Sequence, residues 1–179
     1  MLVPNVITLL AICAGLTAIR LSTEGRMELA VAAIVFAAVL DGLDGRVARM
    51  IKGQSKFGAE LDSLADFVNF GVAPGLILYF WQLHELHNGG WIAAMVFAIS
   101  GGLRLARFNA TMDDPNKPPF AANYFTGVPA PAGAITVLLP IYLSFLGLPR
   151  PPALLPAFYP QLVAFLMVSR LPVFSGKTI

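Results

Sequence analysis

Six long apolar stretches dominate this chain, and they leave little sequence for anything other than membrane-spanning helices. Crossing the hydrocarbon core of a bilayer takes about 20 residues of α-helix. Hydrophobic residues make up 57% of the 179 residues and charged residues 12%, and the mean hydropathy is +0.74, whereas soluble domains carry about 25% charged residues. We therefore predict an all-α, polytopic integral membrane bundle of about six transmembrane helices, formed as a single domain by residues 1–179. The predicted spans are residues 3–21, 29–51, 57–83, 91–108, 130–148 and 153–168.

The first apolar stretch and the distribution of basic residues predict how the bundle is oriented. Residues 1–16 have neither a basic n-region nor an Ala-x-Ala cleavage motif, so we interpret them as part of a retained first helix. Nine of the 12 lysines and arginines fall on one predicted side of the bundle, and cytoplasmic loops carry the excess of positive charge. We therefore expect both termini in the cytoplasm.

Composition argues against two other interpretations. The net charge is only +2 and the basic residues are scattered rather than arranged in a stripe, so no nucleic-acid partner is indicated. The single cysteine, Cys13, lies in the first predicted span and cannot form an intramolecular disulfide. We expect it to pack in the core.

Four aspartates inside apolar sequence require an explanation, because an ionised carboxylate in a low-dielectric environment is costly unless it is paired or binds a metal. Asp41 and Asp44 are three residues apart and Asp62 and Asp66 are four apart, so each pair lies on one helix face. Only two arginines lie nearby, too few for four acids. Carboxylate oxygens in this number suit Mg²⁺, Mn²⁺ or Ca²⁺. We predict a cage of four carboxylates on two facing helices that binds two divalent cations.

The spacing of these acids resembles the motif of a known family. The chain fits D-x2-D-G-x2-A-R-x8-G-x3-D-x3-D, the signature of the CDP-alcohol phosphotransferases. The resemblance covers nearly the whole chain and implies a phospholipid-synthesising transferase, in which an alcohol attacks a CDP-linked lipid and CMP leaves without a covalent enzyme intermediate. The residues that carry the motif are Asp41, Asp44, Gly45, Ala48, Arg49, Gly58, Asp62 and Asp66.

The same resemblance implies a role for each motif residue. All four aspartates would bind metal, and Asp66 would also accept the proton of the acceptor hydroxyl. Arg49 would hold a nucleotide phosphate. Asn5 and Thr8 belong to a Pro-Asn-x-x-Thr pattern similar to one in the family; they either contact the CDP group or cap the first helix, and both interpretations stay open. The cytidine would lie against the small residues Gly45, Ala48 and Gly58.

A second polar cluster, at the end of the fourth predicted span, bears on which alcohol attacks. Arg104 and Arg107 are three residues apart, and a guanidinium can bind a carboxylate with two hydrogen bonds. Without the family, a basic helix terminus is an equally good interpretation. Three segments resemble family members that use L-serine, so we expect CDP-diacylglycerol and L-serine as substrates, with Arg104 or Arg107 and Asn109 binding the serine carboxylate. Glycerol 3-phosphate and inositol phosphate would also need arginines and stay open as acceptors. The three segments are residues 101–109, 125–131 and 169–175.

A different class of function, a divalent-cation channel or transporter, also follows from intramembrane acids. It predicts acids spread along a route across the membrane, whereas these four cluster at one depth beside glycines. The resemblance further implies a homodimer in a microbial cytoplasmic membrane, with the active site facing the cytoplasm. Two local features are also predicted. Lys56 and Glu60 form a surface ion pair, and Pro74 kinks the third helix.

Overall fold

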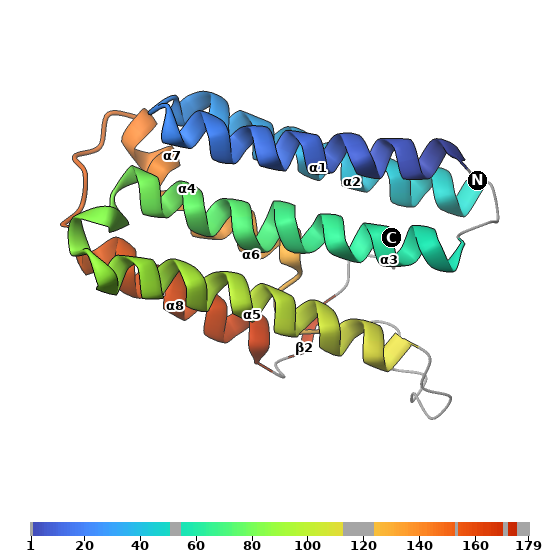
Figure 1. Cartoon of the computed structure of the whole chain (residues 1–179). Helices are drawn as coiled ribbons and strands as arrows, with labels where there is room; N and C mark the ends of the chain where they lie inside the picture. Colours follow the sequence, from blue (N-terminus) through green and yellow to red (C-terminus); the bar gives the residue numbers. More distant parts are fainter. Residues whose placement is uncertain (1, 51–54, 113–123, 153, 170–171, 175–179) are drawn as a thin grey trace.

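The computed structural model describes residues 2–50, 55–112, 124–152, 154–169 and 172–174. These residues form a helical bundle with one short two-stranded ladder (Figure 1). The elements are α1 (Leu2–Thr23), α2 (Met27–Met50), α3 (Lys56–Asp66), the π-helical turn η1 (Phe67–Val72), α4 (Ala73–Trp81), the 3₁₀ turn η2 (Leu83–Leu86), α5 (Asn88–Met112), β1 (Tyr124–Thr126), α6 (Ala130–Val137), α7 (Leu139–Phe145), α8 (Leu154–Val168) and β2 (Pro172–Phe174).

Helices α1 and α2 form an antiparallel hairpin whose tight turn is specified by a glycine. Gly25 has φ = 75°, a conformation that glycine adopts without steric cost. The Arg26 amide donates to the Leu21 carbonyl at 2.9 Å and the Gly25 amide to the Ser22 carbonyl at 3.1 Å, which is the Schellman pattern for ending a helix. Figure 1 shows the hairpin covering the middle layer, formed by α3 and α4, while α5 and α8 pack together on the other side.

Three described helical stretches are long and apolar enough to cross a membrane: Pro4–Thr23, Lys56–Trp81 and Asn88–Ala110. They coincide with the first, third and fourth predicted spans. Large apolar side chains also cover the outside of the bundle; on α8, for example, Phe158 and Phe165 are 73% and 70% exposed. Cys13 of α1 is exposed as well, so the core packing expected for it is wrong. Such a surface suits contact with lipid and is unusual for a soluble monomer. The all-helical membrane fold is thus confirmed, whereas the number of six spans and the orientation of the termini stay predictions.

The third helix contains a π-helical turn directly after Asp66. The Ala73 amide donates to the carbonyl of Val68, five residues earlier, and Pro74 then occupies the first turn of α4. Proline has no amide proton to donate and is tolerated in a first turn, so the wider turn brings the chain past Pro74 without interrupting the helix. Turns of this kind often occur at functional sites.

The fifth predicted span is not one continuous helix. It divides at Leu138 into α6 and α7, and Pro140 lies in the first turn of α7. The apolar composition of residues 130–148 predicted one continuous span and could not show this division. At the other end of α6, β1 pairs antiparallel with β2, with Phe125 opposite Val173. Two of the segments that resemble serine-using enzymes therefore lie side by side.

The core lies between the hairpin and the remaining helices. Its largest fully buried side chains include Ile34 of α2, Phe70 of η1, Ile77 of α4 and Phe97 of α5. Where η1 crosses α5, a Cβ added to Gly101 would lie 3.3 Å from the Gly71 Cα. Small residues allow this close approach of helices in lipid, and they fix the position of α5 relative to the aspartates of α3.

Candidate active site

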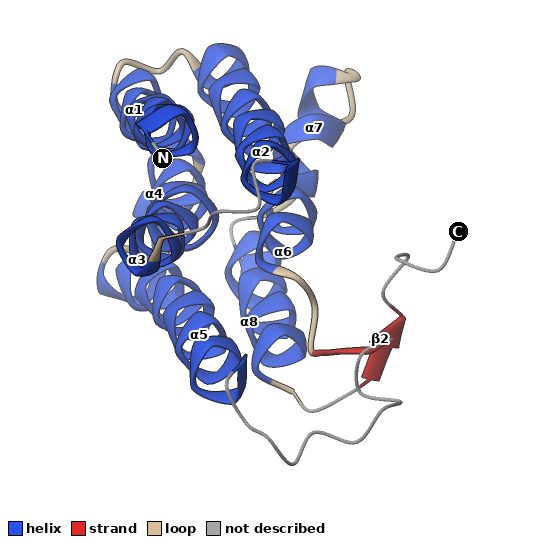
Figure 2. Cartoon of the chain, turned by 90° about the vertical axis from the view of Figure 1, so that its right-hand side faces the viewer, coloured by secondary structure: helices blue, strands red, loops and turns tan. Residues whose placement is uncertain are grey.

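The four aspartates lie at one end of the bundle, where α1 begins, α2 ends and α3 begins (Figure 1). Figure 2 views this end of the molecule. Ser55 caps the start of α3, because its hydroxyl accepts a hydrogen bond from the Gly58 amide at 3.0 Å. A serine at this position stabilises a helix start. The register of α3 is thereby fixed one turn before Asp62.

Three of the four predicted ligands converge. Carboxylate oxygens of Asp41, Asp62 and Asp66 lie within 4.8 Å of one another. Asp41 comes from α2, while Asp62 and Asp66 come from successive turns of α3. The two-helix arrangement predicted from the spacing is thus present, and its central group has three acids.

Asp44 lies beside this group and is bound by a residue of α1. The Thr8 hydroxyl is 2.7 Å from Asp44 Oδ2 and 3.0 Å from the Pro4 carbonyl. Its single proton can serve only one acceptor fully, and the shorter contact is to the carboxylate. Asp44 and Thr8 are both 4% exposed. The structure therefore gives Thr8 a definite contact, with an acid of the motif, where the sequence left capping and ligand contact open.

The unsatisfied atoms of this group fit a divalent cation. Asp62 Oδ1 and Asp66 Oδ1 are buried and have no hydrogen-bond partner among the residues that the structure describes. Among the described residues, the ion pairs join Glu24 to Arg20 and Arg26, and none involves the aspartates. Buried carboxylates are costly unless their charge is balanced, and hard cations such as Mg²⁺, Mn²⁺ and Ca²⁺ prefer oxygen ligands of this kind.

A cavity of about 600 Å³ opens beside Asp62 and Asp66, between α3 and α5. Asn109 Nδ2 donates to Ser63 Oγ at 2.8 Å and so links α5 to α3. Both residues line the cavity, as do Lys56 and Glu60. The predicted surface ion pair between Lys56 and Glu60 is wrong, because it does not occur among the ion pairs of the described residues. Both charges instead border the cavity.

The two arginines of the second cluster have different surroundings. Arg104 is 9% exposed, its Nε is buried without a hydrogen-bond partner, and its charge interacts with that of Asp66. Arg107 is exposed, and its Nη1 donates at 2.6 Å to the Val168 carbonyl, the last residue of α8. A cation at a helix C-terminus binds orphan carbonyls and complements the helix dipole. Arg104 is therefore directed to the acids and Arg107 to α8.

The residues expected to contact CDP have distinct local environments. A Cβ added to Gly45 would meet nothing within 4 Å, whereas one added to Gly58 would lie 3.0 Å from Asn5 Oδ1. Packing within the protein thus gives a reason for glycine at Gly58, and at Gly45 it gives none. The side chains of Ala48 and Arg49 lie outside the described residues.

Sequence reasoning missed Ser63 as part of this site. Lys56, Glu60 and Ser63 are spaced by four and three residues, so they form a second polar face of α3 beside the aspartates. That spacing was available in the sequence. The spacing could not predict which helix packs against this face, since only the fold brings Asn109 of α5 next to it.

Comparisons with known proteins agree with the motif. A sequence model of the CDP-alcohol phosphatidyltransferase family matches residues 1–171. The CDP-diacylglycerol–serine O-phosphatidyltransferase of Mycobacterium bovis is 49% identical over 146 residues, covering 80% of this chain and 51% of the relative. The enzyme of the same name from Mycobacterium leprae is 43% identical over 180 residues, covering 99% of this chain and 60% of the relative. The chain thus spans about half to three fifths of the length of these relatives.

A solved structure shares the fold. The crystal structure of Mycobacterium tuberculosis phosphatidylinositol phosphate synthase with CDP-DAG bound superposes with a TM-score of 0.67 and 23% sequence identity. The match covers 92% of this chain and 80% of the other. At this identity, the likeness concerns the arrangement of the helices.

Proposed function

Because this chain belongs to the CDP-alcohol phosphatidyltransferase family, we propose that it transfers the phosphatidyl group of CDP-diacylglycerol to L-serine, giving phosphatidylserine and CMP. The observation that carries the proposal is the convergence of three carboxylates beside a cavity bordered by both positive and negative side chains. The names of the relatives at 43% and 49% identity support serine as the acceptor. The chain would form one catalytic domain.

Asp41, Asp62 and Asp66 would hold divalent cations, with Asp44 as a further ligand or as a support for the others. Two cations, Mg²⁺ or Mn²⁺ and alternatively Ca²⁺, would balance four carboxylates. When bound, such ions neutralise charge that builds up on phosphate oxygens. The two orphaned oxygens of Asp62 and Asp66 support this assignment.

The transfer itself is a direct displacement at phosphorus. The serine hydroxyl oxygen forms a bond to the lipid-linked phosphorus, the bond from that phosphorus to the CMP oxygen breaks, and the hydroxyl proton passes to Asp66. CMP leaves with the electron pair of the broken bond. A general base must lie within hydrogen-bonding reach of the proton that it accepts, and Asp66 lines the cavity in which we propose serine to bind.

Serine carries a carboxylate and an ammonium, which need charges of opposite sign. Glu60 lines the cavity, whereas Arg104 lies behind its lining and interacts with Asp66, which does line it. Arg104 is the candidate for the carboxylate, because its Nε is buried, lacks a partner and lies near Asp66. Glu60 is the candidate for the ammonium. Asn109 would act by positioning Ser63 and the wall between α3 and α5. Arg107 would support the site by holding the end of α8.

The CDP group would occupy the face of α2 beyond the acids. Gly45 supports this placement, since no atom of the described residues lies within 4 Å of where its Cβ would be. Asn5, Gly58, Ala48 and Arg49 would complete the nucleotide contacts. The protein would work as a homodimer in a microbial cytoplasmic membrane, with this end of the bundle facing the cytoplasm, where the nucleotide product is released.

An acceptor-exchange experiment tests the proposal. Purified protein in detergent is incubated with CDP-diacylglycerol and Mn²⁺ or Mg²⁺, and CMP release is measured with L-serine, glycerol 3-phosphate or inositol phosphate offered separately. We expect release with serine alone and none after chelation of the metal. Release only with another acceptor would keep the displacement and refute the serine assignment. No release with any acceptor, from protein of verified helicity, would refute the transferase and favour the transporter.

A further inference from the structure

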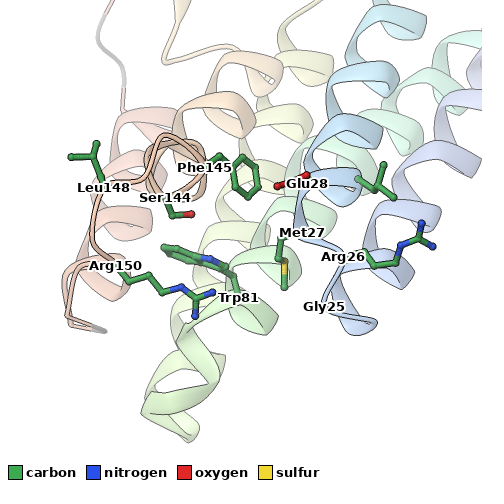
Figure 3. Close-up of a pocket in the computed structure, with 10 residues that line it drawn as sticks. Gly25, Arg26, Met27, Glu28, Trp81, Ser144, Phe145, Leu148 and Arg150 are labelled. Atoms are coloured by element: carbon green, nitrogen blue, oxygen red, sulfur yellow. The ribbon is translucent and has the colours of Figure 1, made fainter.

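A second cavity lies at the end of the bundle opposite the aspartates (Figure 3). It has a volume of about 620 Å³ and lies between the α1–α2 turn, the end of α4 and the loop that joins α7 to α8. Leu29 lines it from α2, 12 residues before Asp41. At 1.5 Å per residue, the two positions are about 18 Å apart along the helix. The cavity is therefore distinct from the catalytic site and independent of it.

Two contacts hold Arg150 and the adjacent Pro151 against the end of α4. Its guanidinium carbon lies 5.9 Å from the centre of the Trp81 ring, within the range of a cation–π interaction. Gln82, which follows Trp81 and is 5% exposed, donates through Nε2 to the Pro151 carbonyl at 2.7 Å. The loop that carries Arg150 is thus tied to the helix that carries Trp81. Figure 3 shows the Arg150 side chain extending toward Trp81.

The N–H donors of Arg150 have no hydrogen-bond acceptor or ion-pair partner among the residues that the structure describes. A guanidinium has five N–H donors, so a cation–π contact with one ring leaves donors available for another acceptor. A guanidinium edge binds phosphate oxygens with two hydrogen bonds. This cavity consequently has an oriented donor for a phosphate.

Glu28 supplies the opposite charge. It lines the cavity from the first turn of α2 and forms no ion pair within the described part of the chain. Arg26, which lies at the rim, has its Nη1 3.9 Å from Glu24 Oε2, too long for a hydrogen bond, and in Figure 3 it extends away from Trp81. The cavity is thus lined by the guanidiniums of Arg26 and Arg150 and by the carboxylate of Glu28, and Arg150 is the guanidinium beside Trp81.

The walls of the cavity indicate that this ligand is a lipid. Leu29, Phe145 and Leu148 are all partly exposed and line it beside the charged groups. An arginine and a tryptophan together at the end of membrane helices are typical of the headgroup level of a bilayer. A primary ammonium can donate hydrogen bonds to the Glu28 carboxylate, whereas a quaternary ammonium has no N–H to donate.

We propose that this cavity binds a phospholipid headgroup with a primary ammonium, whose phosphate is bound by Arg150 and whose ammonium is bound by Glu28. The site lies in the leaflet opposite the aspartates. It adds a lipid contact to the protein that does not take part in the transfer reaction.

Tryptophan fluorescence gives a direct test. The chain has two tryptophans, so the Trp91→Phe variant leaves Trp81 as the only reporter. Short-chain dioctanoyl phosphatidylethanolamine, dioctanoyl phosphatidylcholine and inorganic phosphate are titrated separately into this variant in detergent. We expect a saturable change in Trp81 emission with phosphatidylethanolamine, and a midpoint at least about tenfold higher with phosphatidylcholine, the loss of one charged hydrogen bond.

Variants assign the two charges. Arg150→Gln and Glu28→Gln should each raise the phosphatidylethanolamine midpoint about tenfold or more. Arg20→Gln, in the last turn of α1 and outside the cavity, should leave the midpoint unchanged. If Arg150→Gln does not fold, Glu28→Gln still carries the test. Equal midpoints for the two lipids would refute the role of the ammonium. Saturation by inorganic phosphate at the same midpoint would refute a lipid ligand, and no saturable change would refute the site.

Discussion

The hydrogen bond between Thr8 and Asp44 offers a sharp test of the metal site, because it can be removed without changing any carboxylate. Thr8→Val replaces the hydroxyl by a methyl of similar size. It leaves Asp44 Oδ2, which is 2.7 Å from the hydroxyl in a buried setting, without its donor from α1. The Asp44 carboxylate must then move to find another donor, and this movement takes it away from Asp62.

The size of the effect follows from the nature of this bond. A hydrogen bond to a charged group contributes about 1.5–3 kcal/mol, and each 1.4 kcal/mol changes an equilibrium constant about tenfold. If the full value is lost from cation binding, the affinity for Mn²⁺ falls by about 10- to 100-fold. Residues that support metal ligands commonly have effects of this size when they are substituted.

Free Mn²⁺ is measured by electron paramagnetic resonance during titration of the purified protein, so the readout does not depend on turnover. Thr17→Val is the matched control, since Thr17 lies on the same helix and its hydroxyl donates to the carbonyl four residues earlier, at 2.6 Å, as Thr8 can to Pro4. It contacts no aspartate. Thr8→Ser keeps the hydroxyl and should bind Mn²⁺ like the wild type.

The reasoning is refuted if Thr8→Val and Thr17→Val bind Mn²⁺ with the same affinity while Asp62→Asn binds it more weakly. Asp44 would then lie outside the metal site altogether. If neither Thr8→Val nor Asp62→Asn changes the affinity, the whole carboxylate group would have no role in binding the cation.

Three further predictions address the remaining residues of the site. Asp66→Asn should abolish CMP release, because an amide cannot accept the hydroxyl proton, and should leave binding of CDP-diacylglycerol largely intact. Turnover and lipid binding are measured on the same protein. If turnover persists, another residue is the base. Arg104→Gln should raise the KM for serine about tenfold or more. Arg107→Gln should lower the Tm and leave that KM unchanged, since Arg107 binds a carbonyl of α8. Unchanged serine kinetics in both variants would contradict our acceptor site. Gly45→Ala and Gly42→Ala should each stabilise α2 by about 0.5–1 kcal/mol, because neither added Cβ lies within 4 Å of an atom of the described residues. Only Gly45→Ala should raise the KM for CDP-diacylglycerol. Equal kinetics of the two alanine variants would remove Gly45 from the nucleotide site.

The elements of the site that could be predicted are those that depend on helical spacing alone. Asp62 and Asp66 are one turn apart on α3, and this fact follows from a difference of four residues. Asp41 could be added because four unpaired acids in apolar sequence need a common partner. Convergence of Asp41, Asp62 and Asp66 therefore agreed with expectation.

Spacing could not show which neighbour each side chain meets. Arg104 and Arg107 share one broad face of α5, yet the crossing of α5 between two helices directs one to Asp66 and the other to α8. Lys56 and Glu60 have the spacing of an ion pair, but both border a cavity that exists only because α5 lies nearby. The division of the fifth span at Leu138 likewise depends on local backbone geometry rather than on hydropathy.

The π-helical turn between Asp66 and α4 sets the rotation of α3 relative to α4 about their common axis. Such a turn contains one residue more than a regular helix needs, and one residue corresponds to a rotation of about 100°. Deleting a single residue from Phe67–Val72 would therefore turn the two aspartates of α3 away from Asp41, or else turn α4 away from its core partners. That one additional residue therefore aligns the aspartates of α3 with Asp41 while α4 keeps its place in the core.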